Sequence, residues 1–177
     1  MGEDQKAGGA VSQQMIARIV MVLGAALLVV AFFLPWASAG NEFREAAAKA
    51  PEIMFYEPTG MTVADAADLS LFEYAQVYGS MDGAWQIYMI TMYVALAAAI
   101  VALLFSGLGK PIAAAIFGVA TFAISRLLVW DFGDRGILPN GTHDWGIAPT
   151  VYLVAVIVLV VAAIWLFVLK RREKVDA

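Results

Sequence analysis

The chain has no cysteine and a single histidine, His143. Without cysteine there are no disulfides and no thiolate chemistry, and one histidine excludes every motif that requires two. Charged residues are also scarce, at 15% of the sequence, whereas hydrophobic residues make up 62%. With a mean hydropathy of +0.79, the chain is too apolar for a soluble domain of 177 residues.

Recognisable motifs for catalysis or cofactor binding are missing as well. No glycine-rich phosphate loop follows a strand, and no basic patch alternates with aromatic residues, which argues against nucleic acid. His143 and Asp144 are adjacent, but nucleophilic catalysis would also require a serine beside the histidine. Together with Asp131 and Asp134 they could surround a cation, although the loop lacks the EF-hand order. We predict a protein that is not an enzyme and has no cofactor or metal.

Four long apolar segments dominate what is present. Residues 149–169 contain no charge and, at about 1.5 Å of helix per residue, would span roughly 30 Å, the thickness of a bilayer's hydrocarbon core. Three other segments are similarly long and apolar, namely 16–36, 87–105 and 112–130. The sequence therefore predicts an all-α integral membrane protein with a four-helix transmembrane bundle and a partly helical extracytoplasmic cap.

The first apolar segment has a second interpretation as a signal peptide. Arg18 precedes it, and Ala37-Ser38-Ala39 follows it in the form of a cleavage site. The uninterrupted apolar stretch from Ile19 to Leu34 has 16 residues, slightly more than a signal peptide normally contains. We expect a retained span and keep cleavage as the alternative.

Basic residues predict the orientation of the spans. Lys170, Arg171, Arg172 and Lys174 directly follow the last span, and such residues are retained on the cytoplasmic side. In this orientation seven basic residues lie inside, three lie in outer loops and Arg126 lies in a span, whereas 11 of the 15 acidic residues lie outside. Four tryptophans near the outer ends of the spans agree, because indole prefers the membrane interface: Trp36, Trp85, Trp130 and Trp145.

This orientation assigns every remaining segment to one side of a bacterial inner membrane. The cytoplasmic segments are a tail at 1–15, a turn at 106–111 and a basic tail at 170–177, so both termini are cytoplasmic. The basic tail could touch anionic lipid, but a role in setting the topology is sufficient to explain it. The outer segments are the loops 37–86 and 131–148, of which the first has 50 residues.

The start of the 37–86 loop predicts a short helix and an extended stretch. Asn41 is suited to cap a helix over residues 42–50, which Pro51 would end. Residues 53–56 lie between two prolines and should be extended, and a turn should follow them at Thr59-Gly60.

A second helix is predicted after Ser70. Ser70 and Glu73 have the S-x-x-E spacing of a capping box, in which each side chain satisfies a free backbone N–H. The apolar residues that follow share one helical face, which should lie over the outer end of the bundle. They are Leu71, Tyr74, Ala75 and Tyr78.

The length of the 37–86 loop suggests an interaction surface. A connection between two spans needs only a few residues, and this loop contains aromatic side chains of the kind enriched at the centres of protein interfaces. The candidate interaction residues are Phe55, Tyr56, Phe72, Tyr74 and Tyr78.

Small residues predict how the second and third spans pack. Lipid provides no hydrophobic force between helices, so close backbone approach through small side chains stabilises their contact. In 87–105 the small face includes Ala95, Ala98 and Ala102, and in 112–130 Ala114 and Gly118 have small-xxx-small spacing. We expect these faces to meet in an antiparallel hairpin.

Arg126 is the one charge well inside a predicted span, and such a residue is a functional candidate by default. It lies four residues before Trp130, however, so its head group could reach the outer interface or pair with Asp131 or another outer acid. A role in ligand binding or gating is the alternative.

Two short motifs carry a resemblance to known proteins. Leu34-Pro35-Trp36 ends the first span, and Ser70-Leu71-Phe72-Glu73 begins the helix before the second. In these features the chain resembles small uncharacterised bacterial four-span membrane proteins, and this resemblance implies no activity. The layout is also similar to that of claudins, but claudin-like proteins have a cysteine pair in the first loop, which is missing here.

From these observations we expect a non-catalytic accessory or interaction subunit that presents residues 37–86 outside the cell. Its partners would be the lipid bilayer and either another membrane protein or a second copy of the chain. The alternative is a small carrier or binding protein for a lipid or another apolar ligand within the bundle. A carrier should show a polar cluster or a broken helix at mid-membrane, and spans one, two and four show neither.

Overall fold

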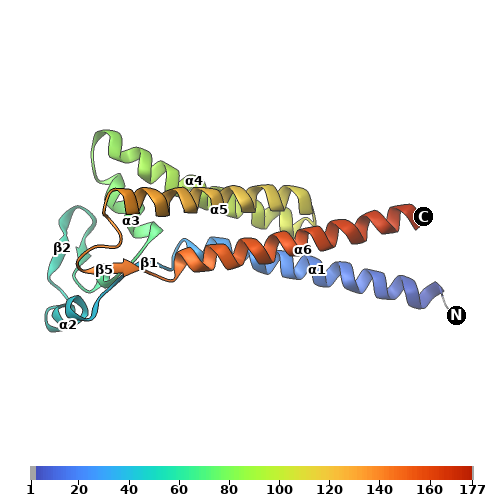
Figure 1. Cartoon of the computed structure of the whole chain (residues 1–177), viewed down its shortest axis with the longest axis horizontal. Helices are drawn as coiled ribbons and strands as arrows, with labels where there is room; N and C mark the ends of the chain where they lie inside the picture. Colours follow the sequence, from blue (N-terminus) through green and yellow to red (C-terminus); the bar gives the residue numbers. More distant parts are fainter. Residues whose placement is uncertain (1–2, 177) are drawn as a thin grey trace.

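The computed structural model describes residues 3–176 and is mostly helical, at 73%. Within these residues, four helices are long and apolar enough to cross a membrane, and they lie side by side along the long axis (Figure 1). They are α1 (Glu3–Ala31), α4 (Gln86–Gly107), α5 (Pro111–Asp134) and α6 (Ala148–Asp176). The chain therefore has the build of a multi-pass membrane protein.

Helix α1 differs from the predicted first span at both ends. It begins at Glu3, so residues 3–15 continue the helix instead of forming a separate tail. Glu, Gln and Ala favour helix, and extending an existing helix costs far less than starting one. The helix ends at Ala31 because Pro35 follows, and proline disfavours a helical conformation in the residue before it. Trp36 consequently lies in a strand and not at the end of the span.

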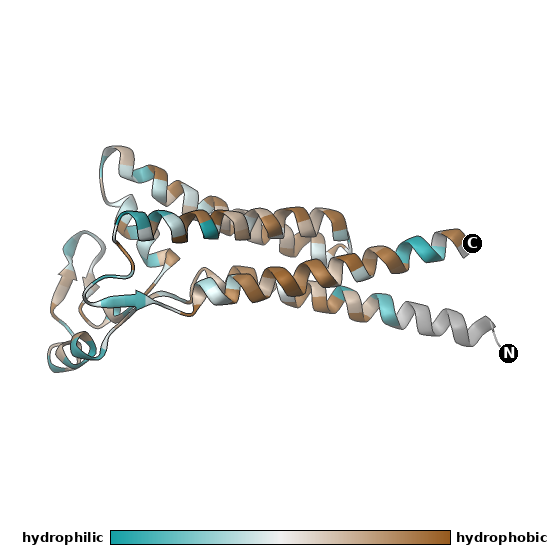
Figure 2. Ribbon diagram, viewed as in Figure 1, coloured by the Kyte–Doolittle hydropathy of each residue, from teal (hydrophilic) through white to brown (hydrophobic). Residues whose placement is uncertain are grey.

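The core between the helices is centred on α1 and α6. Ala17, Met21, Ala25 and Leu28 recur every three or four residues on α1 and are fully buried. At Gly24 the two backbones touch, because a Cβ atom there would lie 2.8 Å from the backbone nitrogen of Leu159. The opposite faces expose large apolar residues along the middle of the helices (Figure 2), as expected for contact with lipid tails.

The small residues of α4 and α5 do not all meet as predicted. Ala95, Ala102, Ala114 and Gly118 are buried, and Ala98 is partly buried. A Cβ atom at Gly118, however, would meet the side chains of Leu159 on α6, at 3.0 Å, and of Leu28 on α1, at 3.5 Å. The expected contact of this small face with α4 is therefore wrong at Gly118.

Aromatic side chains contribute to the contact between α4 and α5. Phe105 of α4 stacks on Phe117 of α5 with ring centroids 5.8 Å apart. Because side chains on both sides of α5 contact neighbouring helices, spacing along its sequence alone could not show which face turned towards α4.

The turn between α4 and α5 is bound by basic residues from the other two helices. Gly109 has a φ of 63°, a left-handed conformation that favours glycine, and Pro111 begins α5. The guanidinium of Arg18 donates a hydrogen bond to the carbonyl of Gly107, and Nζ of Lys170 donates to the carbonyl of Gly109 at 2.7 Å. Arg18, Lys110 and Lys170 therefore gather at one end of the four helices.

The opposite end is formed by residues 35–85 and 136–147, which we call the head. Its main sheet has three antiparallel strands in the order β4-β1-β5: β1 (Pro35–Ala39), β4 (Asp68–Ser70) and β5 (His143–Trp145). Ala37 of the central strand pairs with Leu69 on one side and with Trp145 on the other. The residues of the possible cleavage motif, Ala37-Ser38-Ala39, thus form the central strand.

Smaller elements surround this sheet. They are α2 (Asn41–Lys49), the strands β2 (Met54–Tyr56) and β3 (Met61–Thr62), α3 (Leu71–Gly79) and three 3-10 turns, η1 (Glu57–Thr59), η2 (Asp65–Ala67) and η3 (Gly83–Trp85). The extended stretch at 53–56 is confirmed for Met54–Tyr56, which pairs with β3. Gly60 makes the predicted turn with a φ of 71°.

The two predicted helices of the 37–86 loop are both present. The capping box at α3 is confirmed: the backbone nitrogen of Glu73 donates to Oγ of Ser70 at 3.3 Å, and the backbone nitrogen of Ser70 donates to Oε2 of Glu73 at 2.5 Å. Asn41 is not the cap of α2. It is the first helical residue, and Gly40 precedes it without a side-chain cap. The Gly40 nitrogen donates to the carbonyl of Thr142 at 2.8 Å, which fixes where the helix can start.

Trp36 is a core residue and not an interfacial anchor. Its side chain is fully buried between the head and the helices. Its ring meets those of Phe132, Trp145 and Tyr152 edge to face, with centroids 6.1–6.2 Å apart. The orientation argument from tryptophans does not hold at this position, because Pro35 and Trp36 belong to strand β1, where Trp36 points into the junction. Trp130, by contrast, is 68% exposed.

The contact between α1 and α6 leads to the first prediction. Gly24→Ala should lower the free energy of unfolding by about 1–2 kcal/mol, because the strain of separating two backbones exceeds the gain in helix propensity. Gly107→Ala is the matched control, since nothing lies within 4 Å of its added Cβ. Thermal unfolding in mild detergent measures both, and equal stability of the two variants would contradict the close contact.

Candidate functional site

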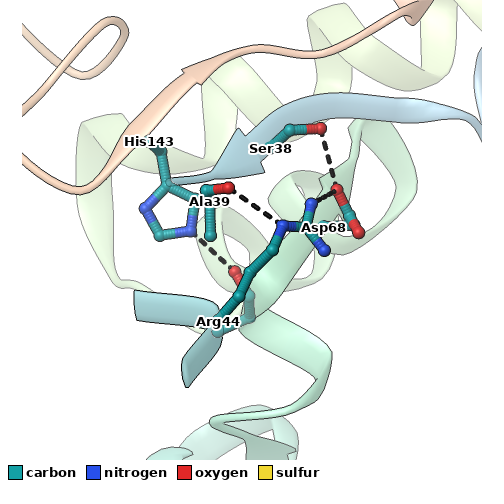
Figure 3. Close-up of polar contacts among 6 residues, drawn as sticks. Ser38, Ala39, Arg44, Asp68 and His143 are labelled. Carbon is teal, nitrogen blue, oxygen red and sulfur yellow. Dashed lines mark hydrogen bonds and ion pairs between the residues drawn. The ribbon is translucent and has the colours of Figure 1, made fainter. Parts of the chain in front are cut away.

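A polar cluster joins three parts of the head (Figure 3). Arg44 of α2 donates from Nε to the carbonyl of Ala39 at 3.0 Å and from Nη2 to Oδ1 of Asp68 at 2.7 Å. Oγ of Ser38 donates to the same carboxylate oxygen at 2.8 Å. These contacts connect α2, the central strand β1 and the start of β4, so the polar cluster determines how α2 sits on the sheet.

The charges in the polar cluster stabilise each other. The hydrogen bond from Arg44 is the main cause that lowers the pKa of Asp68, and burial opposes it. The same contact raises the pKa of Arg44. Because both side chains are about two-fifths exposed, water screens the ion pair, and its role is to position the elements more than to add stability.

His143 is a structural residue of strand β5. Its ring is buried, lies 4.9 Å from that of Phe43, and has Nε2 2.8 Å from the carbonyl oxygen of Ala66. A carbonyl only accepts, so Nε2 is the donor. Nδ1 lies 2.9 Å from Oγ1 of Thr142. Through these contacts His143 connects β5 to η2.

The acidic residues that could have surrounded a cation do not gather around His143. Asp131 pairs instead with Arg135. Among the residues that the structure describes, no group of three or more acidic or histidine side chains could hold a metal ion.

Arg135 is the residue that sequence reasoning missed. It follows α5 directly and lies over the ring of Tyr88 at 4.0 Å from the centroid, with Tyr78 at 5.6 Å and Trp85 at 5.8 Å. Burial favours a lower pKa for Arg135, but the hydrogen bond with Asp131 and the contact with Tyr78 outweigh it and raise the pKa. The i,i+4 spacing of Asp131 and Arg135 was a usable signal, whereas the aromatic contacts come from distant segments.

Arg126 does not make the ion pair considered for it, since Asp131 pairs with Arg135. Its side chain is exposed on α5, beside the exposed Leu127 and on the same side as Trp130. This is the face of α5 directed away from the other helices.

Four of the five candidate interaction residues pack within the molecule. Tyr78 is buried, Tyr74 lies 5.0 Å from the ring of Phe132, and Phe72 lies 5.7 Å from that of Phe33. Burial raises the pKa of Tyr74. Tyr56 is half-buried, and its hydroxyl lies 3.0 Å from that of Ser80. Tyr74 therefore joins α3 to α5, and Tyr56 joins strand β2 to the end of α3.

Phe55 belongs to an exposed surface. Ile53, Met54 and Phe55 are 58%, 49% and 50% exposed, and we call these three residues the apolar tip. They lie on and just before strand β2, at the end of the molecule farthest from the termini (Figure 1). Exposed carboxylates, Glu52 and Glu57, flank the apolar tip in sequence.

No family model, curated protein or solved structure matches this chain. Its function must therefore be inferred from the residues described above. The charges of the polar cluster are paired and the nitrogens of His143 are bonded, which suits a structural role. The apolar tip places three consecutive large apolar side chains at about half exposure, although the ring of Phe55 also meets that of Phe43 edge to face, with centroids 6.0 Å apart.

The pKa of Asp68 leads to a prediction about pH. Because folding lowers this pKa, the ionised carboxylate stabilises the head at pH values above the ordinary 3.8, and this contribution disappears as the pH falls through the lowered value. Asp68→Asn should therefore unfold at a lower temperature than the native chain at pH 7. The two should converge once the pH falls below the lowered pKa of Asp68.

Asp144→Asn is the matched control, because Asp144 is exposed on β5, in the same sheet. Thermal melts followed by tryptophan fluorescence measure all three proteins across the pH range. A difference between Asp68→Asn and the native chain that persists unchanged at low pH would contradict the electrostatic role of Asp68.

Proposed function

We propose that this chain is a non-catalytic accessory subunit of a membrane protein assembly. In this proposal the four apolar helices form a transmembrane bundle, both termini are cytoplasmic, and the head is an extracytoplasmic cap that binds a partner through the apolar tip. The single observation that carries the proposal is the exposure of Ile53, Met54 and Phe55 at the far end of the head.

The distribution of charge supports this orientation. Residues 35–85 and 136–147 contain nine acidic and two basic residues. At the other end, Arg18, Lys110 and Lys170 surround the α4–α5 turn, and Arg171 and Arg172 follow. Basic residues are retained on the cytoplasmic side of membranes, which supports an outer position for the head.

The apolar tip supports a protein partner better than contact with the protein's own bilayer. Strand β2, on and just before which the tip lies, is at the end of the head remote from the helices (Figure 1). Residues that anchor a head to its own membrane would lie where the head meets the helices. Three consecutive large apolar side chains at about half exposure are costly to leave in water. A partner that covers them would gain this apolar burial.

The chemistry around the apolar tip indicates what such a partner presents. Strand β2 pairs only with the two-residue strand β3 in its sheet, so a partner strand could add to it. Glu52 and Glu57 flank the tip. A complementary surface would therefore combine an apolar pocket with lysine or arginine at its rim.

The carrier alternative has less support. The space between the helices contains the fully buried side chains of Met21, Leu28 and Leu159. Gly24 and Gly118 bring α1 and α5 against Leu159. A ligand within the described helices would have to displace this packing.

The orientation predicts which positions an impermeant thiol reagent reaches on intact cells. The chain has no cysteine, so single cysteines report cleanly. Ala64→Cys and Gly141→Cys, both at exposed positions of the head, should be labelled. Leu108→Cys, 65% exposed in the α4–α5 turn, and Ala177→Cys should be labelled only after the membrane is opened. Labelling of Leu108→Cys in sealed cells would reverse the topology.

A photo-crosslinking residue at Phe55 tests the interaction itself. In native membranes it should capture another polypeptide, because Phe55 is half exposed on the apolar tip. Phe55→Ala should cost below about 1 kcal/mol of stability, as expected for a surface residue. Replacing both neighbours of Phe55 in the tip (Ile53→Ser with Met54→Ser) should reduce capture severalfold.

Two other positions serve as controls for the crosslinking. A crosslinker at Phe72 should capture only the chain's own segment after α1, because Phe72 packs against Phe33. One at the exposed Glu45 of α2 should capture much less than one at Phe55. If Phe55 captures only its own chain, and Phe55→Ala unfolds the head, the apolar tip is internal packing and the proposal fails.

A further inference from the structure

A groove lies between α5 and α6 at the basic end of the helices. It has a volume of about 520 Å³, and its lining includes Ile112, Ile116 and Phe167 together with Lys110, Lys170 and Arg171. A second hollow of about 250 Å³ continues it along the same helices to Ala163 and Ile164. We call the two together the basic groove.

The basic groove has one charged end and one apolar end. Helix α5 begins at Pro111 and α6 approaches its end here, so Ile112 and Ile116 run away from the basic end on α5 as Phe167 and Ile164 do on α6. Cations thus stand at the mouth, and successive helical turns provide apolar walls towards the middle of the helices.

Two of the three cations at the mouth are exposed. Lys110 and Arg171 are exposed side chains, whereas Lys170 is partly buried and already donates to the carbonyl of Gly109. The nearest acid on α6 with a described side chain, Glu173, accepts a hydrogen bond from Gln14 of α1 at 3.0 Å. Its carboxylate is therefore held towards α1, and not towards the α5 side, where the groove lies.

We propose that the basic groove binds one anionic phospholipid. Its phosphate would lie between Lys110 and Arg171, and one acyl chain would follow the apolar walls past Ile116. A role in topology explains why basic residues lie at this end, but it does not require a groove whose charged mouth leads into an apolar channel. Basic pockets between transmembrane helices on the cytoplasmic side have the chemistry that selects such head groups.

The proposal rests on the membrane setting and not on the partner of the head, so the two can fail separately. The test uses the full chain in mild detergent, with binding of dioleoyl phosphatidylglycerol measured by native mass spectrometry. One molecule should bind, at least about tenfold more tightly than dioleoyl phosphatidylcholine, which has the same chains but no net charge.

Matched variants separate the mouth from the general charge of this end. Lys110→Gln with Arg171→Gln should weaken phosphatidylglycerol binding about 30-fold, from the loss of two cations near a phosphate. Arg172→Gln removes a neighbouring charge that does not line the groove and should change binding less than about twofold.

A second pair of variants tests the apolar channel. Ala113→Phe fills the groove next to its mouth and should reduce binding by about tenfold. Ala97→Phe places the same ring on an exposed position of α4, which does not line the groove, and should have no effect. Thermal melts confirm that each variant is folded before binding is measured.

Three results would overturn the proposal. The first is equal binding of the two lipids. The second is equal weakening by the Arg172 variant and the double variant. The third is competition by free glycerol 3-phosphate as effective as that of the lipid, which would identify a phosphate site without a role for the acyl chain.

Discussion

The backbone contact between α1 and α6 at Gly24 is the constraint on which the rest of the structure depends. Only glycine allows Leu159 to approach so closely. The same two helices lead directly into the head, because α1 is followed by β1 and α6 is preceded by β5, and these strands pair with each other. The spacing of the helices therefore sets the spacing of the strands. A larger residue at Gly24 would therefore change the position of β1 relative to β5 in the head as well as the distance between α1 and α6.

Trp36 transmits this constraint across the junction. Its buried ring meets Tyr152 of α6, Phe132 of α5 and Trp145 of β5. Arg135 adds a second contact nearby, where its cation lies over Tyr88 while its charge is balanced by Asp131. Aromatic packing thus joins the helices to the head. The polar cluster around Asp68 holds α2 against β1 and β4 within the head.

We propose different partners for the two ends of the molecule. The head has an excess of carboxylates and an exposed apolar tip, which fits a protein surface that is apolar with a basic rim. The other end has an excess of cations and an apolar groove, which fits an anionic lipid. An accessory subunit that binds lipid at one end and protein at the other would couple an assembly to its membrane. The two proposed contacts can be tested separately, because they lie at opposite ends of the helices.

The sequence by itself determined the four apolar helices, the two ends of the molecule at which acidic and basic residues gather, and the capping box of Ser70 and Glu73. These features depend on composition or on spacings of a few residues, which are the same in any fold. The tertiary structure decided which faces meet. Gly118 turned towards Leu159 and not towards α4, Trp36 became a core residue, Phe55 separated from Tyr74 and Tyr78, and Arg135 found its aromatic partners. Each of these outcomes depends on contacts between distant segments, and local spacing contains no information about what lies opposite a residue in space.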